Sequence, residues 1–448
     1  MSIGLSLRRN ISSIILKLLL LSLLVLITWQ YVYFYYHSRP IINTKISSTI
    51  RKATHARKSF ASKLPSSSHI SSSAAPSAKT IRPFISTTKT IHVAVVLSLS
   101  KQASHIAEFH LLYESWRFIQ TFSPLSEQII VDLIVFCEFP SCYQLPASCI
   151  PHSHPYHLNQ IYNCYYHKLD HHIVSDWKDY LYMTSIAFML TPNYRKAVTK
   201  YQWILRVDQD AILSPGLFFG FLGKHPYQLS RMQFGALGHG TEFTNQRLRM
   251  IAQKLGYKHV GVHNLCSTWL VTPKDSIEIA NLTTQIGRYL LDNEFGRHVP
   301  GIEDLPAIGE WPKWWRGVTS LYAAEIAINH IYSSTLTHQH EAPVLDHPAD
   351  SQLSLWLAWH IHCLHNPSYF SKFQHRADLY NFLQRSKTKR IQLITNYYSV
   401  EKIFKQVFDE FYEIHVKNRS LRGEVTVRDY VTVLAWRKAY AATGAINL

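Results

Sequence analysis

Two aspartates, Asp208 and Asp210, directly follow the apolar run at residues 201–205. In an extended segment, side chains two residues apart point to the same side. Both carboxylates can therefore face one Mn²⁺ or Mg²⁺ ion, whose other coordination positions go to diphosphate oxygens and water. Open α/β sheets place their ligands at the carboxyl ends of strands, which is where this pair lies. The alternative is a strand-end turn in which one aspartate caps the element that begins near Ser214 and Pro215.

Two histidines near residue 360 are further candidate metal ligands. His360 and His362 lie two residues apart in the segment 356–363, so an extended strand would place both on one face. Either imidazole could complete a metal site with the aspartates, and imidazole suits Mn²⁺ better than Mg²⁺. The chain holds 26 histidines, so the alternative is a chance pair.

Glu325 is the candidate catalytic base, because small and apolar residues flank it in the segment 320–327. Burial raises the pKa of a carboxyl group towards the range of a useful base. The alternative is a buried ion pair with Arg206 or Arg316. The adjacent carboxylates Glu303 and Asp304 are the competing catalytic candidates.

Tryptophans gather late in the chain at positions 269, 311, 314 and 315. Indole rings offer apolar faces with polar edges, and such faces stack on sugars. Core packing is the expected role of most of these tryptophans, and Trp314 or Trp315 could stack on a sugar, with Trp315 as the predicted binding residue.

The pattern of apolar residues predicts an α/β fold. Strands are expected at 91–97, 129–136 and 201–207, with helices at 104–120 and 176–190 between them. Strand, helix, strand, helix, strand is the doubly wound pattern. Further strands are expected at 263–271 and 353–363, and further helices at 245–255, 274–291 and 318–331. A helical extension at 375–448 is expected to pack on the domain through Phe404, Phe408, Phe411 and Tyr412.

Residues 18–36 are almost wholly apolar or aromatic, which predicts a transmembrane signal anchor. The aromatic residues near its end are typical of a membrane interface, whereas a cleaved signal peptide, the alternative, has a shorter apolar core. Residues 1–17 would be the cytoplasmic tail. Residues 37–90 are rich in Ser, Thr, Ala, Lys and Pro and cannot bury enough surface to fold, so they predict a flexible stem.

The positive charge is confined to the beginning of the chain. Of 46 Lys and Arg residues, fourteen precede the first acidic residue, Glu108, which leaves 32 basic against 29 acidic residues in the remainder. The formal charge of +17 therefore belongs to the tail and stem. A nucleic-acid partner is not expected, because it requires clustered cations on a folded face.

All six cysteines follow the apolar segment, at positions 137, 142, 149, 164, 266 and 363. An even number in an oxidising compartment favours disulfides. Free buried thiols are one alternative, and a zinc site with the neighbouring histidines is another. The acceptor sequons at Asn281 and Asn418 agree with exposure to the lumen of the secretory pathway.

An anchor, a stem, a Rossmann-like half, Asp-x-Asp and a late histidine together resemble the GT-A class of nucleotide-sugar glycosyltransferases. The segment from Asn264 to Trp269, the tryptophan-rich loop and the acidic helix look distantly like retaining mannosyltransferases of the fungal type. The chain looks closer to an uncharacterised family of eukaryotic type II membrane proteins with a domain of unknown function. The likeness covers roughly residues 91–370, and its only firm correspondence is the Asp-x-Asp.

The GT-A likeness implies a single catalytic domain at 91–374 with a mixed sheet. It implies that Asp208, Asp210 and His362 are metal ligands and that Glu325 is the acceptor-side carboxylate. Arg206 and Trp315 would join the aspartates in binding the donor. No glycine-rich loop follows the first strand, so recognition of the base and ribose stays unassigned.

The expected function is transfer of a sugar from a nucleotide-sugar donor to a glycan or glycoprotein acceptor, with Mn²⁺ or Mg²⁺ as cofactor. The expected location is the Golgi or ER membrane, in a single-pass type II orientation with a lumenal catalytic domain. Retention and inversion are both open. The alternatives are a non-catalytic lumenal binding protein on a degenerate GT-A fold and a metal-dependent phosphatase or nucleotidase.

Overall fold

The computed structural model describes residues 90–122, 128–152, 163–222, 232–235, 240–265, 268–295, 314–336, 344–362, 397–417 and 419–442. At 397–400 and 436–442 it describes the backbone only. The chain divides into units 1–84 and 85–448, and all described residues belong to the second. The predicted tail, anchor and stem up to residue 89 lie outside the described ranges. Within those ranges, no helix is long and apolar enough to cross a membrane.

The centre of the second unit is a seven-stranded mixed sheet in the order β3-β4-β2-β1-β5-β8-β7. Its strands are β1 (Ile91–Leu99), β2 (Ile129–Cys137), β3 (Cys149–Pro151), β4 (Cys164–Lys168), β5 (Trp203–Arg206), β7 (Gln233–Phe234) and β8 (Trp269–Val271). Strands β1 to β5 pair in parallel, and β8 is antiparallel to both β5 and β7. The predicted α/β class with a mixed sheet is confirmed.

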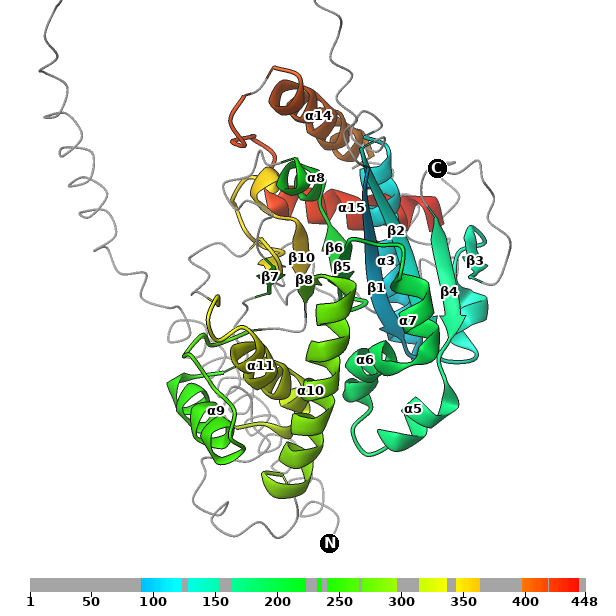
Figure 1. Ribbon diagram of the computed structural model, residues 1–448. Helices are drawn as coiled ribbons and strands as arrows, with labels where there is room; N and C mark the ends of the chain where they lie inside the picture. Colours follow the sequence, from blue (N-terminus) through cyan, green and yellow to red (C-terminus); the bar gives the residue numbers. More distant parts are fainter. Residues whose placement is uncertain are drawn as a thin grey trace, which may run out of the picture. The chain divides into compact units, whose positions relative to one another are not determined.

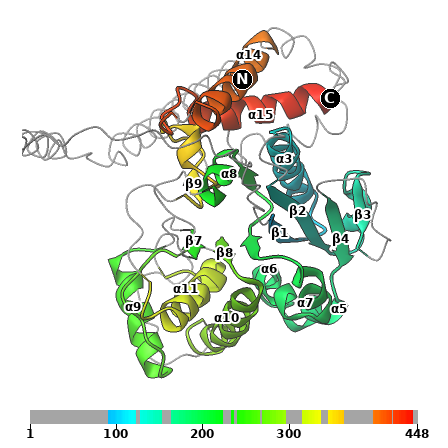
Figure 2. The same cartoon turned by 45° about the horizontal axis from the view of Figure 1, so that its top comes forward.

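Helices cover both faces of this sheet, which explains why β1 is apolar at successive positions. Val93, Val95 and Leu97 face the core on the side of α3 (Ala103–Gln120). Ala94 and Val96 belong to a second core on the opposite side. That side carries α6 (Thr184–Ala187), α7 (Pro192–Val198) and α10 (Pro273–Asn293), with α11 (Thr319–Ile331) beside α10 (Figures 1 and 2).

A second sheet of three strands joins the end of β5 to the late part of the chain. Its order is β6 (Ala211–Leu213), β10 (His360–His362) and β9 (His347–Pro348). Strand β10 pairs antiparallel with β6 and parallel with β9. This small sheet begins four residues after β5 ends, so it lies beside the carboxyl ends of the parallel strands.

The predicted helix at 176–190 is wrong as a continuous element. Short helices stand there instead: η2 (Leu181–Met183), α6 and η3 (Phe188–Leu190), preceded by α5 (His171–Asp176). The hydroxyls of Thr184 and Ser185 donate to the carbonyls of Leu181 and Tyr182, and such local bonds compete with a regular helix.

Two predicted strands are shorter than expected. Of the described residues within 263–271, which are 263–265 and 268–271, only those of β8 form a strand. Asn264 has a φ of 64° and interrupts the extended backbone. Within 353–362 the short helix η5 (Leu355–Leu357) precedes β10. The helices predicted at 104–120, 245–255, 274–291 and 318–331 agree closely with α3, α9 (Glu242–Lys254), α10 and α11. The short helix α8 (Gly216–Phe221) was not predicted.

The C-terminal helices α14 (Tyr397–His415) and α15 (Val427–Ala442) share the core of the larger sheet. Phe404 and Phe411 are buried, and Phe408 is stacked on Phe122 with ring centres 4.8 Å apart. The expectation that Tyr412 packs on the core is wrong, because its side chain is 54% exposed.

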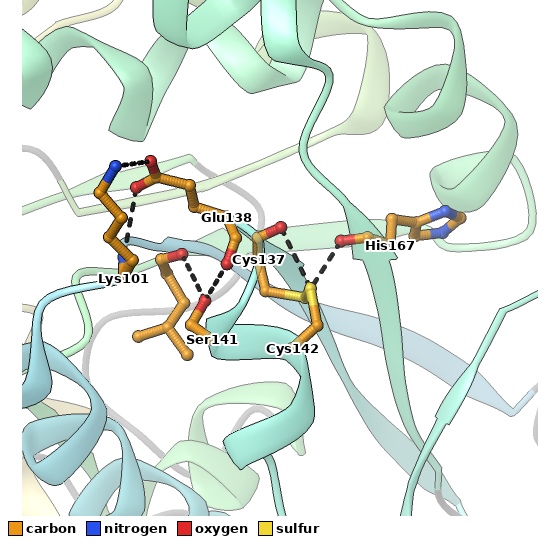
Figure 3. Close-up of a disulfide and its surroundings, with 7 residues drawn as sticks. Lys101, Cys137, Glu138, Ser141, Cys142 and His167 are labelled. Carbon is orange, nitrogen blue, oxygen red and sulfur yellow. Dashed lines mark hydrogen bonds and ion pairs between the residues drawn. A yellow bond between two sulfur atoms is a disulfide. The ribbon is translucent and has the colours of Figure 1, made fainter.

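Two disulfides hold the segments around the far edge of the sheet. Cys137 pairs with Cys142, and Cys149 pairs with Cys164, which confirms the prediction for these four residues and leaves none of their thiols for zinc. Figure 3 shows the first disulfide at the end of β2, beside the ion pair of Lys101 with Glu138. Cys266 and Cys363 lie outside the described residues.

A half-buried histidine pair next to these disulfides makes stability dependent on pH. The rings of His152 and His167 are centred 4.6 Å apart, and His167 is stacked on Phe136 at 4.9 Å. Burial, followed by the positive charge of His152 and Lys196, lowers the pKa of His167 to about 4. An unfolded chain would protonate this histidine near its ordinary pKa of 6.5, so the unfolded state binds more protons between these two values.

We therefore expect the contribution of His167 to the free energy of unfolding to fall by about 1–2 kcal/mol as pH drops from 6.5 to 4, a figure reduced for the partial solvent exposure of its ring. His167→Phe keeps the stacked ring but cannot be protonated, so its stability should fall less over this range. Urea unfolding at several pH values measures the difference. The exposed His172→Phe is the control and should keep the wild-type slope; equal slopes for wild type and His167→Phe would contradict the prediction.

Candidate functional site

Arg206, at the end of β5, is wholly buried and contacts Asp208 directly. Its Nη2 lies 2.7 Å from Asp208 Oδ1, and Nη2 and Nε both donate to the carbonyl of Ser185. The guanidinium also lies 5.9 Å from the centre of the Trp269 ring. These contacts fix Asp208 at the sheet edge, and they make Arg206 a support for the carboxylate rather than an exposed cofactor ligand as predicted.

Asp210 and His362 are brought together by the small sheet. His362 of β10 stands opposite Ala211 of β6, so its ring reaches back to the residue before the strand. His362 Nε2 lies 3.6 Å from Asp210 Oδ2, while the side chain of His360 is only 1% exposed. The structure thus places His362, and not His360, against the predicted metal-binding aspartate.

The distance of 3.6 Å between these two atoms is informative. It is too long for a hydrogen bond. Two ligand atoms that bind one cation at about 2.1 Å are separated by roughly 3.0–3.4 Å. Asp210 and His362 therefore lie nearly at the separation that a shared cation requires.

The chemistry of these donors fits a Mn²⁺ ion better than Mg²⁺, because one donor is an imidazole nitrogen. Among the residues that the structure describes, no group of three or more His, Cys, Asp or Glu side chains is arranged to hold a metal. The chain itself offers Asp210 and His362, with Asp208 held by Arg206 nearby. The remaining ligands would have to come from the substrate and water.

Asp346 is a functional candidate that the sequence analysis missed. It is fully buried, has a φ of 55°, and accepts a hydrogen bond from the Thr268 hydroxyl at 2.6 Å. Burial alone raises the pKa of the Asp346 carboxyl, but hydrogen bonds and positive charge from His360 and His362 outweigh it and hold that pKa well below the usual range. The available signal was an aspartate at the end of the apolar pair Val344-Leu345, just before a histidine.

Glu325, the predicted base, is fully buried on α11. Its Oε1 lies 2.8 Å from His263 Nδ1 and 3.2 Å from His259 Nε2, and its Oε2 accepts from the amide of Leu265 at 3.3 Å. A carboxylate so enclosed cannot itself touch a substrate, so any proton that it helps to move must pass through an imidazole. Asp304, the other predicted catalytic carboxylate, lies outside the described residues.

The predicted stacking residues divide into core and surface. Trp269 and Trp314 are fully buried, and Trp314 is stacked on Tyr322 with ring centres 4.6 Å apart. Trp315 is partly exposed, and its ring lies so close to Gly317 that a Cβ there would overlap it. Of these three, only Trp315 keeps a surface for a ligand.

Two exposed aromatic rings, which the sequence analysis did not single out, follow the carboxyl end of β2. Phe139 is 60% exposed and Tyr143 is 70% exposed, with ring centres 5.4 Å apart in an edge-to-face arrangement. The Cys137–Cys142 disulfide closes the segment that carries Phe139. Strand β2 is separated from β5 by β1 alone, so the backbones of these two strands lie about 10 Å apart.

The fold and this edge define an α/β protein with a mixed sheet and a cluster of acids and histidines where its parallel strands end. A family model described as a domain of unknown function (DUF7164) matches residues 87–430. The chain belongs to this family. No curated protein matches the chain, and no solved structure does.

Because Glu325 is enclosed by its partners, we expect its replacement to lower the free energy of unfolding. Glu325→Gln removes a carboxylate oxygen from the group that Glu325 forms with His259 and His263, and leaving a buried polar group without its hydrogen-bond partner costs about 1–3 kcal/mol. Urea unfolding of the variant should show a loss of that order. The exposed Glu278→Gln, on α10, is the matched control and should change stability by less than about 0.5 kcal/mol. A stable Glu325→Gln variant would show that the imidazoles do not depend on this carboxylate.

Proposed function

We propose that this protein is a metal-dependent glycosyltransferase that moves a sugar from a nucleotide-sugar donor to a glycan or glycoprotein acceptor. The observation that carries the proposal is the approach of His362 Nε2 to Asp210 Oδ2 at the carboxyl edge of a mixed α/β sheet. Open α/β sheets bind their ligands at this edge. One carboxylate and one imidazole there suit a cation that is shared with a diphosphate.

The residues of the site would divide the work between binding and orientation. Asp210 and His362 would hold Mn²⁺, and the ion when bound would stabilise the negative charge of a departing nucleoside diphosphate. Arg206 would hold the Asp208 carboxylate at the sheet edge, where the side chain of Asp208 is 29% exposed. Trp315 offers a partly exposed ring to a sugar.

The acceptor hydroxyl would be activated by Glu325 of α11 and the two histidines that it contacts. Glu325 contacts His259 and His263, so deprotonation of an acceptor hydroxyl would proceed through one of these imidazoles, with the carboxylate stabilising the imidazolium. Such a base is required if the transfer inverts the configuration of the sugar's anomeric carbon, and it is dispensable if the transfer retains that configuration. The proposal applies to an inverting and to a retaining enzyme.

The proposed setting is the lumen of the Golgi or ER, with the chain held as a single-pass type II protein by residues 18–36. The disulfides Cys137–Cys142 and Cys149–Cys164 support it, because disulfides persist in the oxidising secretory pathway. The GT-A likeness is supported by the mixed sheet. The family match to a domain of unknown function leaves the activity open.

The metal assignment is tested by thermal unfolding of the full-length protein in detergent with UDP or GDP, each with and without Mn²⁺. A ligand at a hundred times its Kd stabilises a protein by about 2.7 kcal/mol. We expect this stabilisation only with Mn²⁺, and we expect Asp210→Asn and His362→Gln to abolish it. Asp409→Asn, exposed on α14, is the control and should keep it.

Retained Mn²⁺-dependent stabilisation in Asp210→Asn would show that the metal assignment is wrong. The same preparation also separates the alternatives when it is given nucleotide sugars or nucleotides. With a nucleotide sugar, a transferase releases a nucleoside diphosphate and glycosylates an acceptor. With UDP or GDP alone, a nucleotidase releases inorganic phosphate, and a binding protein converts neither substrate.

The exposed aromatic pair predicts where the nucleobase stacks. The aromatic pair follows β2 and the aspartates follow β5, and the backbones of these strands lie about 10 Å apart, which would suit a nucleoside whose diphosphate is held at the metal site. Stacking of a base on an aromatic ring contributes about 1–3 kcal/mol. Phe139→Ser with Tyr143→Ser should raise the Kd for UDP or GDP about 10–100-fold and leave the Kd for pyrophosphate unchanged, both measured with Mn²⁺ by calorimetry. Tyr412→Ser, an equally exposed tyrosine on α14, is the control. Equal losses for nucleotide and pyrophosphate would remove the stacking role.

A further inference from the structure

The outer face of α10 carries the sequon Asn281-Leu282-Thr283 in the middle of a regular helix. Asn281 is exposed, and so are Glu278 and Gln285, which lie one turn before and one turn after it on the same face. The buried residues of α10 lie on its other side, through which the helix packs against α6 and α11. A large hydrophilic group on the Asn281 side chain would therefore displace none of the packed residues.

Thr283, the hydroxyl residue of this sequon, has the opposite environment. It is 0% exposed, and among the described residues its Oγ1 is buried without a hydrogen-bond partner. In the same helix, Ser276 and Thr284 donate to the carbonyls of Pro273 and Asn281 at 2.7 and 2.9 Å. A buried hydroxyl that makes no hydrogen bond lowers stability, because folding removes it from water without a replacement partner. Valine has nearly the same shape and would avoid that loss.

The folded state thus does not explain the hydroxyl of Thr283, but the sequon does. An asparagine accepts an N-linked glycan when Ser or Thr stands two residues later. Side chains two residues apart on a helix do not face each other, and here one is exposed and the other buried. An enzyme that contacts both side chains can therefore bind them only before α10 has formed.

We propose that Asn281 carries an N-linked glycan added to the unfolded chain, and that the Thr283 hydroxyl serves this reaction rather than the fold. The donor is an oligosaccharide joined through a diphosphate to a membrane lipid. The Asn281 side-chain nitrogen forms a bond to the anomeric carbon of the first sugar, and the bond from that carbon to the phosphate oxygen breaks. The lipid diphosphate leaves, and the nitrogen loses one proton to a base of the transferring enzyme.

The inference rests on the lumenal setting proposed above, because such glycans are added to chains that enter the secretory pathway. It is independent of the proposed glycosyltransferase activity. It concerns a face of α10 that holds none of the residues of the candidate site.

The test uses the full-length protein expressed in eukaryotic cells and digested with trypsin, which releases residues 275–288 as one peptide. Peptide N-glycosidase in H₂¹⁸O converts a glycosylated asparagine to an ¹⁸O-labelled aspartate. We expect the label at position 281 in the wild type and its loss in Thr283→Val, although Asn281 is retained. Thr284→Val, which changes a buried threonine outside the sequon, is the matched control and should keep the label.

A second measurement shows whether the hydroxyl serves the fold. In an Asn281→Gln background, which has no acceptor at this position, Thr283→Val should leave the midpoint of urea unfolding unchanged or raise it. Thr284→Val should lower the midpoint, because it removes the hydrogen bond to the carbonyl of residue 281. A midpoint lowered by Thr283→Val would show that the hydroxyl is structural, which would overturn its assignment to the sequon.

A reporter sequon separates this inference from the proposed setting. Arg195→Thr creates a second acceptor sequence at Asn193, and both positions are exposed on α7. A glycan at Asn193 without one at Asn281 would overturn the inference and leave the lumenal setting in place. Absence of a glycan from both asparagines would remove the lumenal setting, and the inference with it.

Discussion

The antiparallel pairing of β6 with β10 is the constraint on which the candidate site depends. Asp210 and His362 are far apart in the chain, and only this pairing brings the late histidine to the end of β5. Register matters because successive side chains of a strand point to opposite faces. A slip by one residue would place Ile361 at the position of His362 and turn the imidazole away from the carboxylate. The site is thus specified by strand alignment before any charge is considered.

The small sheet is held in place by the C-terminal helices. Tyr430 of α15 donates its hydroxyl to the Leu213 carbonyl at 3.0 Å, and Ser214 donates to the carbonyl of Ala358. Trp356, just before β10, donates to Glu410 of α14 at 2.7 Å. The side chains of these helices belong to the same core as β1 and α3. Helices α14 and α15 therefore stabilise a candidate site whose own residues lie elsewhere in the chain.

The sequence predicts the long elements because their signal is local. The buried runs at β1 and β2 and the helices α3, α10 and α11 follow from periodicity alone. The short strands β6 and β9 carry no such signal, since they have three and two residues, and β10 was predicted only as part of a longer strand at 353–363. Asp346 was missed for the same reason: its role follows from burial, a positive φ and contacts with Thr268 and His362, all of which arise from tertiary structure. The two aspartates were found because their spacing is itself local.

The structure gives the two aspartates different electrostatic environments. Asp208 lies 2.7 Å from a guanidinium that is wholly buried, so a large part of its charge balances Arg206. Asp210 faces an imidazole, whose charge depends on its proton. A buried cation needs a permanent counter-ion, because an uncompensated charge in the interior costs several kcal/mol. Asp208 meets that need, so under the proposed function Asp210 and His362 would be the pair that attracts an added cation.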